Sequence, residues 1–193
     1  MTTFDREAAG RRLRLTPSQA ALLVVDVQER LVAAMPPEVI NGVIKNVRRL
    51  VHLAEQLKIP VFASEQYPKG LGRTIPELRE LLPSPPLEKT RFSCGADPAF
   101  AAELETTGRR QVIIVGMETH VCVFQTTRDL VAMGYEVHVC ADAVSSRTEE
   151  HRRVGLELCR EVGAIVTTAE TAIFDLLHEA ATPEFRKVAP LVK

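Results

Sequence analysis

The chain has 193 residues, of which 46% are hydrophobic and 25% charged, and its 24 basic and 25 acidic residues leave a formal net charge of −1. This composition excludes a disordered or collagen-like chain, and the length fits one domain with a full-sized core. The balanced charge argues against a broad nucleic-acid surface, and no apolar run approaches the roughly 20 residues of a membrane span.

The N-terminal region and the cysteines indicate a protein of a reduced compartment. Residues 1–18 contain a short basic cluster and lack the apolar core of a signal peptide, so we interpret them as an arm before a single domain at 19–193. The cysteines, at positions 94, 122, 140 and 159, form no CxxC pair. Their spacing argues against a zinc knuckle or a disulfide scaffold, and we expect a cytoplasmic location.

The first half of the chain predicts two strands, one helix and a long loop. Ala20–Val25 is a continuous apolar run that ends at Asp26, as in a strand buried on both faces. Apolar residues from Val39 to Leu57 recur at helical spacing, and Val61–Ala63 predicts a second strand. Prolines and glycines crowd residues 65–89, which predicts a loop with one helical turn, and a connection of this length is usually functional.

The next elements also alternate between helix and strand. Asp97 and the proline that follows it predict the start of a helix, which ends at Gly108. Val112–Val115 predicts another buried strand, Thr119–Met133 a helix, and 136–140 a further strand.

The last part of the chain completes the pattern. Ser146-x-x-Glu149 and Thr167-x-x-Glu170 have the spacing of capping boxes and predict the starts of two helices, with a strand at 164–166 between them. Strands and helices that alternate in this way are typical of an α/β doubly wound sheet. The sequence therefore predicts one three-layer αβα domain.

In sheets of this class, ligands bind beyond the carboxyl ends of the strands. Asp26 directly follows six apolar residues, so it is either a base whose pKa is raised by burial or a turn or helix-capping residue. Cys122 lies at the predicted start of a helix, where N–H groups and the helix dipole favour a thiolate and a developing oxyanion. The alternative for Cys122 is a small buried hydrophobic residue. Lys89 is either a surface charge or the cation that keeps Asp26 and Cys122 ionised.

The remaining candidates carry weaker signals. His120 stands two residues before Cys122, and residues two apart on a helix do not face each other, so we do not expect it to be the base. The histidines lack metal-binding spacing, and no glycine-rich nucleotide-binding motif occurs. We expect Cys140 and Cys159 in the core and Cys94 in an exposed, oxidisable loop.

Three ordered motifs resemble the isochorismatase-like cysteine hydrolase superfamily. They are Leu22–Gln28, the segment that begins at Lys89, and Val115–Val123. Segments at 64–72 and 142–147 look like those of isochorismatase domain-containing proteins in particular. The resemblance implies a six-stranded parallel sheet and a homo-oligomer.

The resemblance also implies site residues. It assigns a catalytic triad of Asp26, Lys89 and Cys122, a cis peptide bond between Met117 and Glu118, and an oxyanion hole made by the N–H groups of Glu118 and Cys122. Metal-dependent nicotinamidases have an aspartate and two histidines after the second strand, and the corresponding loop here contains no histidine. We therefore expect neither a metal nor another cofactor. Isochorismate cleavage is also disfavoured, because family members with that activity need not use a cysteine nucleophile, whereas this chain keeps one.

These features together predict a hydrolase of a small amide, or of a related acyl or C–N bond, that works through a thioester. The expected partner is a small-molecule substrate, without nucleic acid or membrane. The predicted pocket residues are Gln28, Leu31, Tyr67, Phe92 and Met117. The alternative is a non-catalytic binding or scaffold protein of the same fold.

Overall fold

The computed structural model describes residue 10 and residues 12–192. Within them, six strands form one parallel sheet in the order β3-β2-β1-β4-β5-β6. The strands are β1 (Ala20–Val25), β2 (Val61–Gln66), β3 (Leu87–Lys89), β4 (Gln111–Met117), β5 (Glu136–Ser145) and β6 (Ile165–Thr167). The predicted α/β fold is confirmed.

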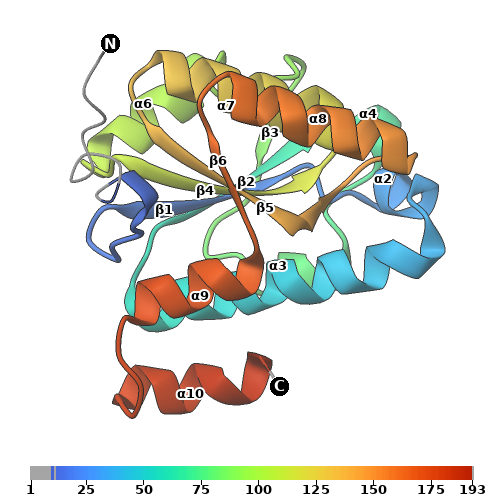
Figure 1. The fold of residues 1–193 in the computed structure, drawn as a ribbon. Helices are drawn as coiled ribbons and strands as arrows, with labels where there is room; N and C mark the ends of the chain where they lie inside the picture. Colours follow the sequence, from blue (N-terminus) through green and yellow to red (C-terminus); the bar gives the residue numbers. More distant parts are fainter. Residues whose placement is uncertain (1–9, 11, 193) are drawn as a thin grey trace.

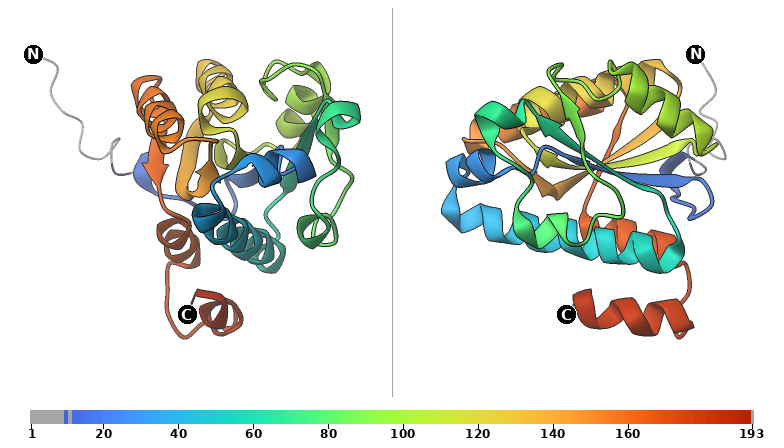
Figure 2. Two further views of the ribbon diagram at one scale, coloured as in Figure 1. Left: turned by 90° about the vertical axis from the view of Figure 1, so that its right-hand side faces the viewer. Right: turned by 180° about the vertical axis from the view of Figure 1, so that it is seen from behind.

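Helices cover both faces of the sheet (Figure 1). One face carries α3 (Pro37–Leu57) and α9 (Ala169–Leu177), with α10 (Pro183–Val192) outside them. The opposite face carries α6 (Pro98–Thr106), α7 (Phe124–Ala132) and α8 (Glu149–Glu161). The short helices α2 (Glu29–Ala34) and α4 (Pro68–Leu71) lie at the carboxyl end of the strands, which the left view of Figure 2 looks onto.

The apolar run of β1 is continuous because the strand contributes to two cores. Leu22 and Val24 pack into the cluster beneath α3 and α9, whereas Leu23 and Val25 pack into the cluster beneath α6, α7 and α8. Alternate residues of a strand point to opposite faces, so a strand between two helical layers needs an apolar side chain at every position.

Three parts of the chain differ from the prediction. The 65–89 segment contains α4, a second short helix α5 (Pro76–Arg79) and the edge strand β3, so it is more ordered than a loop with one helical turn. The predicted helix at 119–133 begins with a π-helical turn, η1 (Thr119–Val123), before α7. Strand β5 also continues past residue 140 to Ser145, with a register shift opposite β4.

Both predicted N-caps from the capping boxes are wrong, by two residues for α8 and by one residue for α9. The N-cap of α8 is Thr148, whose side chain accepts from the N–H of His151, and the N-cap of α9 is Thr168, which accepts from the N–H of Thr171. A neighbouring threonine in each case occupies the extended conformation that a cap requires. The predicted cap of α6 is confirmed, since Asp97 accepts two backbone N–H groups.

Part of the predicted N-terminal arm lies outside the described residues, namely 1–9 and 11. The rest of the arm contacts the domain, because Leu15 is buried in the core and Arg12 donates to the carbonyl oxygen of Gly163. Within the part of the chain that the structure describes, we find no helix long and apolar enough to cross a membrane.

Candidate functional site

Asp26 ends β1 and is completely buried, at 0% exposed. Its backbone φ of 48° lies in the left-handed region, which aspartate tolerates better than most residues, and this turn ends the strand. One carboxylate oxygen, Oδ1, accepts from Ser64 Oγ at 2.8 Å, and the other, Oδ2, accepts from Lys89 Nζ at 2.8 Å. The two oxygens are therefore held by different donors.

Lys89 reaches this carboxylate from the edge strand β3. Its ammonium group donates to Asp26 Oδ2 at 2.8 Å, to Gln66 Oε1 at 2.8 Å and to the carbonyl oxygen of Phe92 at 3.1 Å. These bonds use all three donors of the group, and its side chain is 0% exposed, so the surface-charge alternative is wrong. Burial is the largest single effect and opposes the charge, but the combined effects of Asp26, Cys94 and Cys122, with Asp26 foremost, raise the pKa of Lys89.

One glutamine contacts the Lys89 ammonium, and a second, which was expected at the site, holds the backbone of the first. Gln66, which the sequence reasoning missed, accepts from Lys89 and donates to the carbonyl oxygen of Thr90 at 2.9 Å. Gln28 accepts from the Gln66 N–H and donates to the carbonyl oxygens of Gln66 and Gly72. Both the oxygen and the nitrogen of the Gln28 side-chain amide thus bind backbone groups.

Cys122 lies on η1, close enough to Asp26 for the charge of the carboxylate to act on its thiol. The residue is 5% exposed. Burial, followed by the negative charge of Asp26, raises the pKa of the thiol, and Lys89 opposes this shift. The expectation that the helix start lowers this pKa is therefore wrong, because an extra negative charge here would be buried beside a carboxylate.

Glycine at position 116 allows β4 to pass close to β1. Its φ is 114°, and a Cβ there would lie 2.0 Å from the carbonyl oxygen of Val25. The peptide bond between Met117 and Glu118, one residue further along the chain, is cis, as expected. The Glu118 side chain is largely buried, and its Oε1 accepts from Nε of the more exposed Arg147 at 3.0 Å.

His120 faces α8 rather than the thiol. Its Nδ1 lies 3.0 Å from Ser146 Oγ, and its ring stacks on His151 with centroids 4.4 Å apart. Helix α8 comes this close because Gly155 has no side chain, since a Cβ there would lie 2.8 Å from the backbone nitrogen of His120. These contacts agree with the expectation that His120 is not the base for Cys122.

The other predicted pocket residues lie in different environments. Tyr67 and Phe92 are exposed, at 54% and 51%. The backbone N–H of Tyr67 donates to the carbonyl oxygen of Lys89, and the Lys89 ammonium donates to the carbonyl oxygen of Phe92. Leu31 is half-buried on α2, whereas Met117 is buried in the core beneath α3. Contact of these side chains with a substrate stays a prediction.

The prediction for Cys94 is wrong, whereas Cys140 and Cys159 are in the core as expected. Cys94 is 0% exposed, and its thiol donates to Ser64 Oγ at 3.4 Å. Its backbone N–H donates to Thr126 Oγ1 at 2.9 Å, which fastens the loop to α7. The loop lies beneath a helix layer that the local sequence does not reveal.

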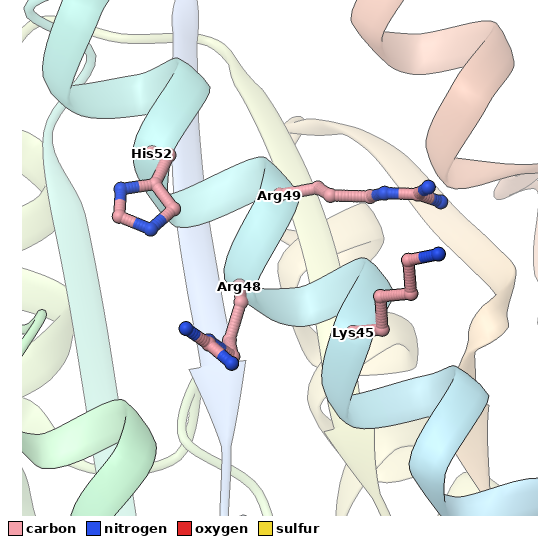
Figure 3. Close-up of a pocket in the computed structure, with 4 residues that line it drawn as sticks. All are labelled: Lys45, Arg48, Arg49 and His52. Atoms are coloured by element: carbon pink, nitrogen blue, oxygen red, sulfur yellow. The ribbon is translucent and has the colours of Figure 1, made fainter. Parts of the chain in front are cut away.

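A separate hollow on the outer side of α3 is lined by Lys45, Arg48, Arg49 and His52. In Figure 3, Lys45 and Arg49 extend to one side of the helix and Arg48 and His52 to the other. The four side chains do not converge on one point. Among the described residues, no group of three or more His, Cys, Asp or Glu side chains is arranged to hold a metal ion.

Comparison with known proteins identifies relatives along nearly the whole chain. Residues 20–171 match the family model of the isochorismatase domain. The chain is 40% identical over 195 residues to the secreted isochorismatase effector Isc1 of Phytophthora sojae, which covers 96% of this chain and 90% of that protein. It is 38% identical over 179 residues to isochorismatase domain-containing protein 1 of Danio rerio, covering 93% of this chain and 62% of that longer protein.

Two solved structures have the same fold. The MAR1 ribonuclease of Caenorhabditis elegans is 40% identical, with a TM-score of 0.86 over 93% of this chain and 92% of that one. The YcaC gene product of Escherichia coli, described as an octameric hydrolase of unknown specificity, is 25% identical, with a TM-score of 0.82 over 93% and 87% of the two chains.

Proposed function

This chain belongs to the isochorismatase family, whose membership supports a hydrolase function, and we propose that it is a cysteine hydrolase of small amides or related acyl or C–N bonds. One observation carries the proposal. The buried carboxylate of Asp26 accepts from the Lys89 ammonium at 2.8 Å, and its negative charge acts on the nearby Cys122 thiol, so a nucleophile, a base and a cation lie together.

The raised pKa of Cys122 is compatible with this chemistry. Loss of the thiol proton to water would leave a net negative charge in a buried site, which burial opposes. Transfer of the same proton to Asp26 moves the negative charge from oxygen to sulfur and leaves the total charge unchanged, with Lys89 still beside it. The thiol is therefore neutral at rest and ionises as it attacks.

The reaction then proceeds in two halves. The Cys122 sulfur forms a bond to the substrate carbonyl carbon, and the N–H groups of Glu118 and Cys122 hold the developing oxyanion. The C–N bond breaks as protonated Asp26 gives its proton to the leaving amine, which leaves a thioester. Asp26 next takes a proton from water, the hydroxide displaces the sulfur, and the acid leaves as Cys122 recovers its proton.

Three variants test the mechanism against a panel of small amides and esters. Cys122→Ala and Asp26→Asn should each lower kcat/KM by roughly 10³-fold or more, because the nucleophile or its base is lost. Cys140→Ala, a buried thiol in the core, is the matched control and should keep full activity. Full activity of Cys122→Ala would overturn the mechanism, and tight substrate binding without turnover by the native protein would favour the scaffold alternative.

RNA belongs in the same panel, because the Caenorhabditis elegans relative is described as a ribonuclease. RNA cleavage that is lost in Cys122→Ala, with every amide and ester untouched, would refute the proposed substrate class. We propose that the reaction needs no metal, so activity should survive dialysis against a chelator.

We also propose a homo-oligomer in the cytoplasm. The octameric description of the YcaC gene product and the exposed aromatic rings of Tyr67 and Phe92 support self-association. Light scattering during size exclusion should give a mass that is a multiple of 21.3 kDa, and a monomer would refute this part. Microscopy of the tagged full chain tests the location, since the Phytophthora relative is described as secreted.

A further inference from the structure

We propose that Cys94 is a positioning residue that acts on Asp26 through the hydroxyl of Ser64. The inference rests on the proposed role of Asp26 as the base. Cys94 lies outside the Asp26, Lys89 and Cys122 motifs, and its thiol forms no bond to any of these three side chains. Its influence on the reaction would pass through a single hydroxyl.

The direction of the hydrogen bonds is set by chemistry. Cys94 Sγ and Ser64 Oγ lie 3.4 Å apart, and Ser64 Oγ lies 2.8 Å from Asp26 Oδ1. An ionised carboxylate only accepts, so the single hydroxyl hydrogen of Ser64 points to Asp26. The thiol must then be the donor to the serine oxygen. Cys94 therefore donates to Ser64, and Ser64 donates to Asp26.

The surroundings keep Cys94 in the donor form. Burial raises the pKa of the Cys94 thiol to about 11, so the proton is present at neutral pH. The backbone of Cys94 is held by Thr126 on α7, and a Cβ on the next residue, Gly95, would lie 3.2 Å from Asp129 Cβ on the same helix. This close packing fixes the thiol relative to β2, which carries Ser64.

These hydrogen bonds set the orientation of the Asp26 carboxylate, the proposed base. Lys89 holds one oxygen of Asp26 and Ser64 holds the other, and together they prevent rotation of the carboxylate. If the Cys94 thiol is removed, the Ser64 oxygen loses its buried donor, and the hydrogen bond from the Ser64 hydroxyl to Asp26 becomes weaker because bonds in a chain polarise one another. The carboxylate then spends less time in the orientation that receives the Cys122 proton.

The test compares Cys94→Ala, Cys94→Ser, Ser64→Ala and the double variant Ser64→Ala/Cys94→Ala, with Cys140→Ala as control. Cys94→Ala should lower kcat roughly 10-fold with KM nearly unchanged, and Cys94→Ser, which keeps a donor, should recover most of the loss. The acidic limb of the pH profile of kcat/KM should move to higher pH in Cys94→Ala, because weaker hydrogen bonding to a carboxylate disfavours its charged form.

The double variant decides whether Cys94 acts through Ser64. It should be no slower than Ser64→Ala alone, whereas two independent losses that multiply would overturn the inference. Activity of Cys94→Ala equal to that of Cys140→Ala would also overturn it. If Cys94→Ala does not fold, the pH profile of Ser64→Ala takes its place, and an unshifted acidic limb there would refute the inference. Full activity of Asp26→Asn would instead remove the proposed function, so the two failures are distinguishable.

Discussion

The buried ion pair between Lys89 and Asp26 should couple these residues strongly in folding. The test replaces each charge by a neutral side chain of similar size, in Lys89→Met, Asp26→Asn and the double variant. Asparagine also tolerates the left-handed backbone at position 26, where φ is 48°, so the substitution removes charge with little backbone strain.

The size of the effect follows from burial. Both side chains are 0% exposed and their charged atoms lie 2.8 Å apart, a separation at which the attraction is roughly 6 kcal/mol for an effective dielectric constant of 20. Desolvation of the two ions offsets much of this, so the intact pair adds little net stability. Removal of one partner leaves a buried charge and should cost about 3–5 kcal/mol, and removal of both should cost less than the sum.

Urea denaturation of the four proteins measures the coupling, which should exceed about 2 kcal/mol, with the double variant more stable than Lys89→Met. Arg153 and Glu157 on α8 supply a matched control, since their charged atoms are 2.6 Å apart but the side chains are 57% and 53% exposed. That pair should couple by less than about 1 kcal/mol. Equal coupling in the two pairs would refute the argument that burial, rather than distance, sets the magnitude.

Three further measurements test other features. Gly116→Ala should lower the free energy of unfolding by about 3 kcal/mol or more, because φ is 114° and the new Cβ would lie 2.0 Å from a carbonyl oxygen of β1. Gly134→Ala, with φ of 88° and open space, should lose only about 1 kcal/mol, and equal losses would contradict the close approach. Burial lowers the pKa of His138 from 6.5 to about 4, so the unfolded chain takes up this proton first as pH falls. Stability present above pH 6.5 should decline by up to about 3 kcal/mol toward pH 4, and His138→Leu should show a shallower decline in denaturation curves. Iodoacetamide should label Cys122 more slowly at pH 7 than a free cysteine, as measured by mass spectrometry. Labelling as fast as that of a free cysteine would contradict the raised thiol pKa.

Much of the fold is encoded by local patterns. The apolar run of β1 requires burial on both faces, the helical spacing of α3 requires one apolar face, and Asp97 caps α6 with its own side chain. Each of these signals lies within one element. The motif resemblance likewise identified the family and the cis bond before Glu118, because both depend on contiguous residues.

The caps of α8 and α9 mark the limit of such patterns. In each case two hydroxyl residues lie close together near the helix start, and the backbone conformation decides which of them caps. Thr148 and Thr168 have extended backbone and accept the N–H groups. The capping-box spacing occurs at Ser146 and Thr167, whereas the helices are capped by Thr148 and Thr168, so the spacing alone did not identify the caps.

By itself, the sequence determined the layered α/β fold, the family and three candidate residues that follow strands. Only the tertiary structure decided that β3 pairs with β2, which buries Lys89 against Asp26, and that Cys94 and Gln66 lie beside them. The strand at Leu87–Lys89 contains two charged residues among three and has no apolar pattern of its own. Its position depends on backbone pairing with a distant segment, and the charges of the site depend on burial by that pairing, which no local pattern specifies.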